Sequence, residues 1–274
     1  MKKLITLICL SLALTPNIFA QEKDPATIQD PVVANPEKSD KDVSKSEEIE
    51  KAKKVLSAKE ALLEARKAKS EKPLSEIKDI KITTIVNVVL SGTNFEVSNE
   101  TTIKFPNKTL TIINGPFGEI KNAYDGNIAW ALTPGGTQVI VGDNALEFAN
   151  ALAGDPFSIL NNFDKEDYKI TLLENNLFEG QNVTTILCTT STGHEITVYL
   201  DPKTNMIVGK SAQSKSAGVV SVNEEIYSNF QKVEGVEIPM KRLLKRNGLP
   251  FAEVEVKEVK INSGVDDKIF VKPE

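Results

Sequence analysis

Apolar and polar residues alternate along most of the chain after residue 78, which is the pattern of β-strands with one buried face. Residues 79–90 read DIKITTIVNVVL, in which Ile80, Ile82, Val86 and Val88 share one parity while polar residues occupy much of the other. Because successive side chains on a strand point to opposite faces, this alternation predicts a strand. Comparable segments separated by turn residues recur as far as residue 261. They predict about ten or eleven antiparallel strands in sequential hairpins, and a sheet of that size curls, so we expect one strongly curved antiparallel sheet.

Two segments carry the helical period instead. Between residues 47 and 69, apolar residues recur at near-helical spacing with lysine and glutamate between them, and Pro73 bounds the predicted helix. Residues 143–163 interrupt the β pattern and predict two short helices. We expect Asp143 to cap the first helix and Asp155 to cap the second, which has a proline at its favoured first position. The fold class predicted from these patterns is mainly β with helices.

The N-terminal segment indicates export. Residues 1–20, MKKLITLICLSLALTPNIFA, have a basic start and a short apolar core, which is typical of a signal peptide, here cleaved near Ala20. The core is shorter than the roughly 20 residues that span a bilayer, so we expect no transmembrane segment in the mature chain and a periplasmic location. Residues 21–46 are rich in Pro, Asp, Lys and Ser and predict a disordered tether. The folded domain is expected over residues 47–274, without a disulfide, because Cys188 is then the single cysteine.

Charge and motifs exclude several classes of function. The formal net charge of -5 argues against nucleic acid as a main partner. His194 is the only histidine, so a multi-histidine zinc site is excluded. Cys188 and His194 fall on neighbouring predicted strands, and a hydrolase would need the two side chains within hydrogen-bond reach. No orienting motif surrounds either residue, so we predict a protein without catalytic residues, metal or cofactor, and a hydrolase stays the weaker alternative.

Several short segments form an ordered set. They are KDIKITTIVNVVLSG, KFPNKTLTI, AYDGNIAW, VYLDPKTNMIVG, YSNFQKVEGVEIPMKR and VKINSGVDDKIFVKP. In this order they resemble segments of the outer-membrane lipoprotein-sorting (LolA-like) family of periplasmic carrier proteins. The second and third segments resemble the family's K-P strand and its Y-D-G-x-x-x-W motif. The resemblance extends over residues 56–273.

This resemblance implies a half-open β-barrel whose concave apolar face is covered by helices, with a hollow that receives acyl chains. The residues expected to line the hollow are Ile82, Val86, Val88, Phe95, Val97, Ile103, Phe105, Leu110, Ile112 and Trp130. The residues expected on the movable lid, hinged at Gly154, are Leu146, Leu152, Phe157 and Leu160. The sequence departs from the family at Lys108, because carriers that sort lipoproteins have an arginine on the strand after K-P, and lysine lacks its planar fork of donors. The resemblance therefore implies a hydrophobic-ligand role more broadly than a strict lipoprotein shuttle.

Two functional classes remain open. The first is a periplasmic, non-enzymatic carrier of lipid or lipid-modified protein, with an acyl chain or other hydrophobic ligand in the hollow and an envelope protein as donor or acceptor. The second is an envelope protein–protein interaction module that docks a partner on the curved sheet while its own side chains fill the hollow. Lipid in the purified protein would separate the two classes.

Overall fold

A computed structural model describes residues 57–273 except residues 91, 175–176 and 217–218. The predicted signal peptide, the predicted tether and residues 47–56 of the predicted first helix lie outside the described residues. Among the residues that are described, no helix is both long and apolar enough to cross a membrane.

The described residues form one antiparallel sheet of thirteen strands and a separate two-stranded hairpin. The strands of the sheet are β1 (Asp79–Leu90), β2 (Thr93–Lys104), β3 (Lys108–Gly115), β4 (Gly118–Tyr124), β5 (Ala129–Thr133), β6 (Gly136–Ile140), β7 (Lys169–Leu173), β10 (Thr184–Thr189), β11 (Glu195–Leu200), β12 (Ile207–Ser216), β13 (Val219–Val233), β14 (Val236–Arg246) and β15 (Leu249–Ile261). The hairpin is β8 (Leu177–Phe178) with β9 (Gln181–Asn182). The predicted mainly β fold with a single large antiparallel sheet is confirmed.

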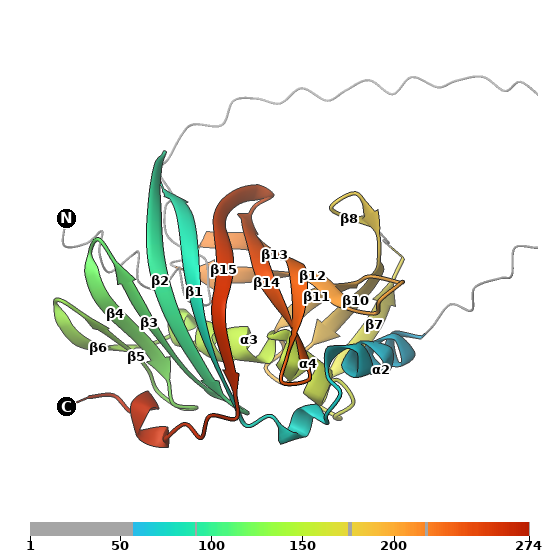
Figure 1. Cartoon of the computed structure of the whole chain (residues 1–274), viewed down its shortest axis with the longest axis horizontal. Coiled ribbons are helices and arrows are strands. Elements are labelled where there is room, and N and C mark those ends of the chain that lie inside the picture. Colours follow the sequence, from blue (N-terminus) through green and yellow to red (C-terminus); the bar gives the residue numbers. More distant parts are fainter. Residues whose placement is uncertain (1–56, 91, 175–176, 217–218, 274) are drawn as a thin grey trace, which may run out of the picture. The chain divides into compact units, whose positions relative to one another are not determined.

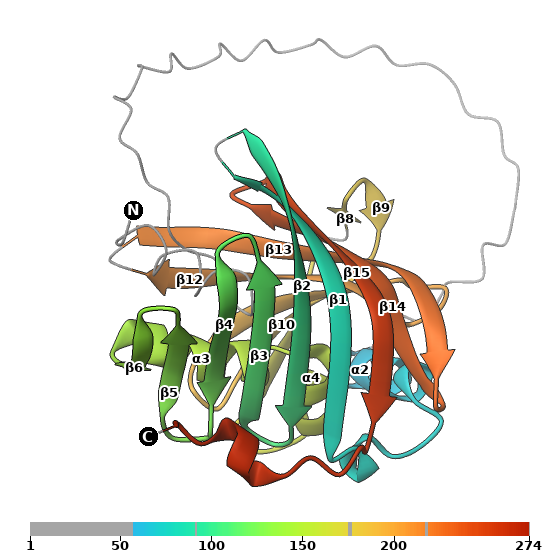
Figure 2. The ribbon, with the colours of Figure 1, turned by 60° about the vertical axis from the view of Figure 1, so that its left-hand side comes forward.

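The order of the strands shows two meanders joined at the middle. From edge to edge it is β6-β5-β4-β3-β2-β1-β15-β14-β13-β12-β11-β10-β7, so the sheet is open, with β6 and β7 at its edges. Figure 2 shows β12 and β13 running across the direction of β1 to β4, as the twist of a large sheet requires. The sheet has more strands than expected, in part because the largely exposed β6 has no apolar alternation.

Three α-helices and two short 3-10 helices accompany the sheet in the described part of the chain (Figure 1). They are α2 (Ala58–Lys69), α3 (Asp143–Ala153), α4 (Pro156–Asn162), η1 (Leu74–Glu76) and η2 (Asp267–Phe270). Ser57 and Glu60 cap α2 reciprocally, in the arrangement called a capping box.

The predicted caps of α3 and α4 have different outcomes. Asp155 caps α4 as predicted, because its side chain accepts from the amide of Phe157. The prediction for α3 is wrong: Gly142, with φ 65°, stands at the cap position, and Asp143 is the first helical residue. The left-handed conformation of this glycine starts the helix one residue earlier than the aspartate rule indicates.

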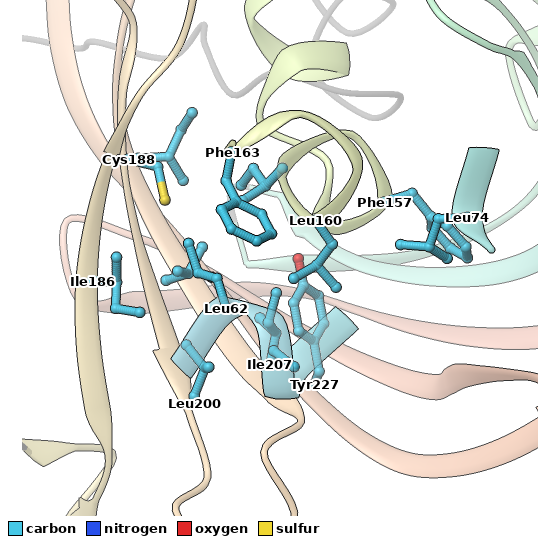
Figure 3. Packing of buried hydrophobic residues seen from close by; sticks show 14 of the residues in the cluster. Leu62, Leu74, Phe157, Leu160, Phe163, Ile186, Cys188, Leu200, Ile207 and Tyr227 are labelled. Carbon is cyan, nitrogen blue, oxygen red and sulfur yellow. The ribbon is translucent and has the colours of Figure 1, made fainter. Parts of the chain in front are cut away.

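The largest hydrophobic cluster lies between the helices and the second meander. α2 contacts α4, β7 and β14. Figure 3 shows Leu62 of α2 facing Leu160 of α4 and the strand residues Ile186 and Leu200. These four side chains are at most 2% exposed. We call the side of the sheet that carries α2, α3 and α4 the helix face.

Two smaller clusters lie on the first meander. One contains Val86, Val97, Ile113 and Val254 and continues along the helix face. The other contains Leu110, Ala123, Trp130 and Phe270. It lies on the opposite face, which we call the outer face, where the C-terminal helix η2 contacts β3. The first meander is therefore buried on both faces over part of its length.

Candidate functional site

A cavity of about 190 Å³ lies between the helix face of the sheet and the junction of α3 with α4. Strands β1, β2, β14 and β15 supply most of its apolar wall, and the helix junction supplies Ala151, Pro156 and Phe157. The apolar strand residues that line it are Ile80, Ile82, Val86, Ile103, Ile238, Leu244, Phe251, Val254 and Val256.

Strand register explains why these side chains meet. Val86 of β1 pairs with Val97 of β2 on one side and with Val254 of β15 on the other. Residues directly opposite each other in an antiparallel pair point to the same face. The alternation recognised in residues 79–90 therefore continues across the neighbouring strands and gives the helix face an apolar row.

The predicted wall residues of β1 and β2 lie on the helix face. Ile82, Val86 and Ile103 line the cavity itself. Val88 and Val97 belong to the adjoining cluster of the helix face.

The two predicted phenylalanines of the wall do not line the cavity. Phe95 is half-buried and pairs with Val88 near the start of β2. Phe105 lies beyond the end of β2, with its ring centroid 6.1 Å from that of Phe157. It therefore contacts the α4 side of the site without reaching the cavity.

Three predicted wall residues lie on the wrong face for that role. Leu110, Ile112 and Trp130 all lie on the outer face, in or against the cluster around Phe270. The indole Nε1 of Trp130 donates to the carbonyl oxygen of Phe270 at 2.7 Å. Trp130 is therefore a buried anchor for the C-terminal segment.

The reason for this misplacement is that β3 is buried on both faces. Thr109 and Thr111, which alternate with Leu110 and Ile112, are at most 1% exposed and face the helix side. When the polar residues of an alternating strand are buried as well, its apolar residues do not identify which side faces the helices.

The predicted lid residues are divided between buried and exposed positions. Leu152, Phe157 and Leu160 are buried, whereas Leu146 is 50% exposed and takes no part in the covering. Phe148, which sequence reasoning missed, is the buried aromatic residue of α3, with its ring centroid 6.4 Å from that of Tyr124.

Gly154 joins α3 to α4 and contacts strand β12 of the sheet. Its carbonyl oxygen accepts from Lys210 Nζ at 3.2 Å. A Cβ at this position would lie 3.1 Å from the carbonyl oxygen of Asn150, so a larger residue would crowd the end of α3. The predicted hinge role of Gly154 remains a prediction.

Charged side chains gather at one end of the cavity. The charge cluster, as we name it, consists of Lys69, Asp155, Lys210, Glu225 and Arg242, all of which border the cavity. Lys210 Nζ lies 3.1 Å from Glu225 Oε1, and Arg242 Nη1 lies 4.0 Å from Glu225 Oε2. Lys69 Nζ donates to the carbonyl oxygen of Glu237.

Burial changes the protonation behaviour of this cluster. It lowers the pKa of Lys69 from 10.5 to about 8. It also raises the pKa of Asp155, against the opposing effect of Lys210. Burial disfavours the ionised form of Glu225 too, but Lys210 and Arg242 outweigh it and hold the pKa of Glu225 below its ordinary value.

Sequence reasoning missed the charge cluster because its members come from five separate elements. A charged residue in an alternating strand is ordinarily on the solvent side. The prediction that Glu224 and Glu225 point to opposite faces is consistent with the register, because Glu225 pairs with Leu244 on the helix face. Tyr227, two residues further on and buried, donates to Glu225 Oε2 at 3.1 Å. Glu225 and Tyr227 are two positions apart and so point to the same face of β13, and this spacing was the signal by which the sequence could have placed Glu225 on the helix face.

Lys108 does not reach the helices. Its Nζ lies 3.1 Å from Asp267 Oδ2, and Nζ of the neighbouring Lys104 lies 2.8 Å from Oδ1 of the same carboxylate. Lys108 therefore ties η2 to the outer face.

The candidate catalytic couple shows no mutual contact within the described residues. Cys188 is fully buried, and burial raises the pKa of its thiol to about 12. Burial and the nearby Lys210 lower the pKa of His194. A thiol with such a pKa is protonated at neutral pH, so it is a poor nucleophile. The described residues contain no group of three or more His, Cys, Asp or Glu side chains placed to hold a metal ion.

No family model and no curated protein matches the sequence. Solved structures do share the fold. A LolA superfamily protein from Nitrosomonas europaea has a TM-score of 0.55 and 15% identity, covering 80% of this chain and 99% of that chain. A DUF1329 family protein from Desulfovibrio piger has a TM-score of 0.54 and 14% identity, covering 78% and 97%.

A third structure has the same fold. It is a domain described as an outer membrane lipoprotein-sorting protein, from Vibrio parahaemolyticus, with a TM-score of 0.50 and 14% identity, covering 78% of this chain and 97% of that chain. The chain therefore shares its fold with these three structures, among them one described as a LolA superfamily protein and one described as a lipoprotein-sorting domain, and the resemblance found in its sequence is confirmed at the level of the fold.

Proposed function

We propose that this protein is a non-enzymatic carrier in the periplasm that binds an acyl chain or another hydrophobic ligand in the cavity of the helix face. In this proposal the sheet acts as a strongly curved half-open barrel, and α3 with α4 forms the lid over its concave side. The observation that carries it is the cavity between sheet and helices, with an apolar wall on β1, β2, β14 and β15, in a fold shared with a domain described as lipoprotein-sorting.

The size of the cavity determines how the ligand enters. An apolar cavity of about 150 Å³ in another protein holds one benzene ring, and the volume here is about 190 Å³. The cavity itself therefore has room for roughly one short segment of an acyl chain. In this proposal a longer chain is accommodated when α4 moves away from the sheet, which displaces Phe157 from the cavity wall.

The contacts of α4 suit a lid that opens at moderate cost. The helix has seven residues, and it is fastened at its far end by Arg66, whose guanidinium pairs with Asp164 at 3.1 Å through two nitrogens. Its near end carries Phe157, which contacts the cavity. Each methylene that enters an apolar site contributes about 0.8 kcal/mol, so a chain of ten methylenes offers about 8 kcal/mol against the cost of opening.

The test is ligand content and ligand binding of the purified protein. Organic extraction followed by mass spectrometry should find stoichiometric lipid in protein isolated without detergent. Fluorescence titration with the neutral probe N-phenyl-1-naphthylamine should show saturable binding. Ile82→Trp, which fills the cavity, should weaken binding at least tenfold, whereas Thr83→Trp, on the other face of the same strand, should leave it unchanged.

The alternative role, an envelope interaction module with a self-filled hollow, is favoured by the small volume of the cavity. Lipid-free protein that does not bind the probe in wild type would support that role and contradict the carrier. Equal binding by the Ile82→Trp and Thr83→Trp variants would place the ligand elsewhere on the protein.

A further inference from the structure

The wall of the cavity has an apolar side and a charged side, and one row of paired residues runs from one to the other. Arg242 of β14 pairs with Val254 of β15, Val254 pairs with Val86 of β1, and Val86 pairs with Val97 of β2. Neighbouring strands are about 4.8 Å apart, so about 10 Å separates Arg242 from Val86 across the sheet. Arg242 also pairs with the buried Tyr227, which places it on the helix face.

Arg242 is the cation of the charge cluster whose donors are unused. Among the described residues its guanidinium makes no hydrogen bond, and its ion-pair contact is the 4.0 Å approach to Glu225 Oε2. Lys210, by contrast, donates to Gly154 and pairs with Glu225, and Lys69 donates to Glu237. A guanidinium has five N–H donors in a planar fork. The side chain of Arg242 is 31% exposed, so an incoming group can reach it.

Among the five members of the charge cluster the cations outnumber the carboxylates by one, and Glu237, which is not among the cavity-lining residues, acts on Lys69. The cluster contains three cations and two carboxylates when all its members are ionised. Glu224 and Lys245 also border the cavity, but the alternation of their strands turns both side chains to the outer face. There Lys245 Nζ lies 2.7 Å from Glu179 Oε1. A partly buried charge in excess is stabilised by a counter-charge within reach, and Arg242 is the member placed to receive one.

We propose that the ligand is a single-chain amphiphile with one anionic head group, a carboxylate or a phosphate. Its head is held by the fork of Arg242, and its chain lies across Val254 and Val86 under Phe157. This inference rests on the proposed carrier function and specifies the chemistry of its ligand. Arginine is suited to this role because its fork matches the two oxygens of a carboxylate or phosphate.

The experiment compares amphiphiles that differ only in the head group. Dodecanoate and dodecyl phosphate, below their critical micelle concentrations, and dodecanol, below its solubility limit, compete with N-phenyl-1-naphthylamine at neutral pH. Charge-assisted hydrogen bonds are worth about 1.5–3 kcal/mol, so the affinity of both anions should be at least about tenfold higher than that of dodecanol. Acetate and inorganic phosphate, which lack the chain, should not displace the probe.

Two variants of β14 assign the effect to the head group. Arg242→Gln should bring dodecanoate to the affinity of dodecanol and leave dodecanol unchanged. Lys241→Gln, an exposed neighbour on the opposite face, should keep the wild-type preference. Arg242→Lys, which keeps the charge but loses the fork, should retain part of the preference and serves if the glutamine variant does not fold.

The outcomes separate this inference from the proposed function. Equal affinity of wild type for dodecanoate and dodecanol, or an equal loss of both in Arg242→Gln, overturns the anionic head group while the carrier stands. Failure of every amphiphile to displace the probe contradicts the carrier itself. Displacement by phosphate or acetate alone would mean an anion site without a chain site, and that also overturns the inference.

Discussion

Lys69 gives the protein a pH-dependent stability that a single substitution should remove. The ammonium of Lys69 is buried at the end of α2, with Nζ 4.4 Å from the ring centroid of Phe157. Burial lowers its pKa from 10.5 to about 8. Because the pKa of the folded state lies below that of the unfolded state, the unfolded chain binds more protons between pH 8 and 10.5, and stability rises with pH in that window.

The size of the effect follows from the shift. Each pH unit of full difference in proton binding is worth about 1.4 kcal/mol. Between pH 7 and pH 9, about one pH unit lies above the folded-state pKa of about 8, where the folded protein has lost the proton that the unfolded chain still binds. Lys69 should therefore add about 1.4 kcal/mol to the free energy of unfolding over this range, at the order-of-magnitude level.

Urea unfolding at pH 7 and pH 9 measures the effect as a difference between variants. Lys69→Met should lose about 1.4 kcal/mol of the pH-dependent gain seen in wild type. Lys67→Met, on the exposed side of the same helix, should retain the whole gain. Other groups that titrate in this range cancel in the comparison. An identical pH dependence in wild type and Lys69→Met would show that the ammonium is solvated, and the described geometry of the charge cluster would then be wrong.

Three further predictions concern the attachments of the helices and the core. Arg66→Ala removes the paired contact with Asp164 and the hydrogen bond of 2.5 Å to the carbonyl oxygen of Leu160. Chemical unfolding should therefore show a loss of about 2 kcal/mol in the free energy of unfolding. Stopped-flow fluorescence should show a faster release of N-phenyl-1-naphthylamine. Trp130→Phe removes the donor to the Phe270 carbonyl; this should cost about 1–3 kcal/mol, and hydrogen exchange should show η2 protected less than in wild type. Cys188, with its pKa raised to about 12, should react with iodoacetamide at pH 8 only as fast as the protein unfolds, which mass spectrometry can follow; fast labelling of the native state would contradict its burial.

The sequence was sufficient where one face of a strand is exposed. In β1 one set of alternate residues is polar, and its members Lys81, Thr83 and Asn87 are partly or fully exposed to solvent. The other, apolar set therefore identified the helix face correctly. In β3 both parities are buried, and the same rule placed Leu110 and Ile112 on the wrong side. Alternation of apolar and polar residues identifies the core-facing side of a strand only when the other side is exposed to solvent.

The charge cluster illustrates the other limit of sequence reasoning. Its members are separated by up to 173 positions between Lys69 and Arg242, and only the pairing of strands brings them together. Alternation gives the faces of each strand, but it does not reveal which strands are neighbours or where the twisted sheet approaches the helices. The family resemblance supplied the fold, and the polar end of the cavity is absent from what that resemblance implied.

The pairing of β1 with β15 has a consequence for how the chain is made. These two strands begin about 170 residues apart, which at ordinary rates of synthesis is roughly 10 to 30 s of ribosome time. Without β15, the edge of β1 that faces away from β2 has no partner strand, and such an edge invites pairing with other chains. The seam between the two meanders therefore closes only when β15 joins, and until then the sheet exists as two separate parts.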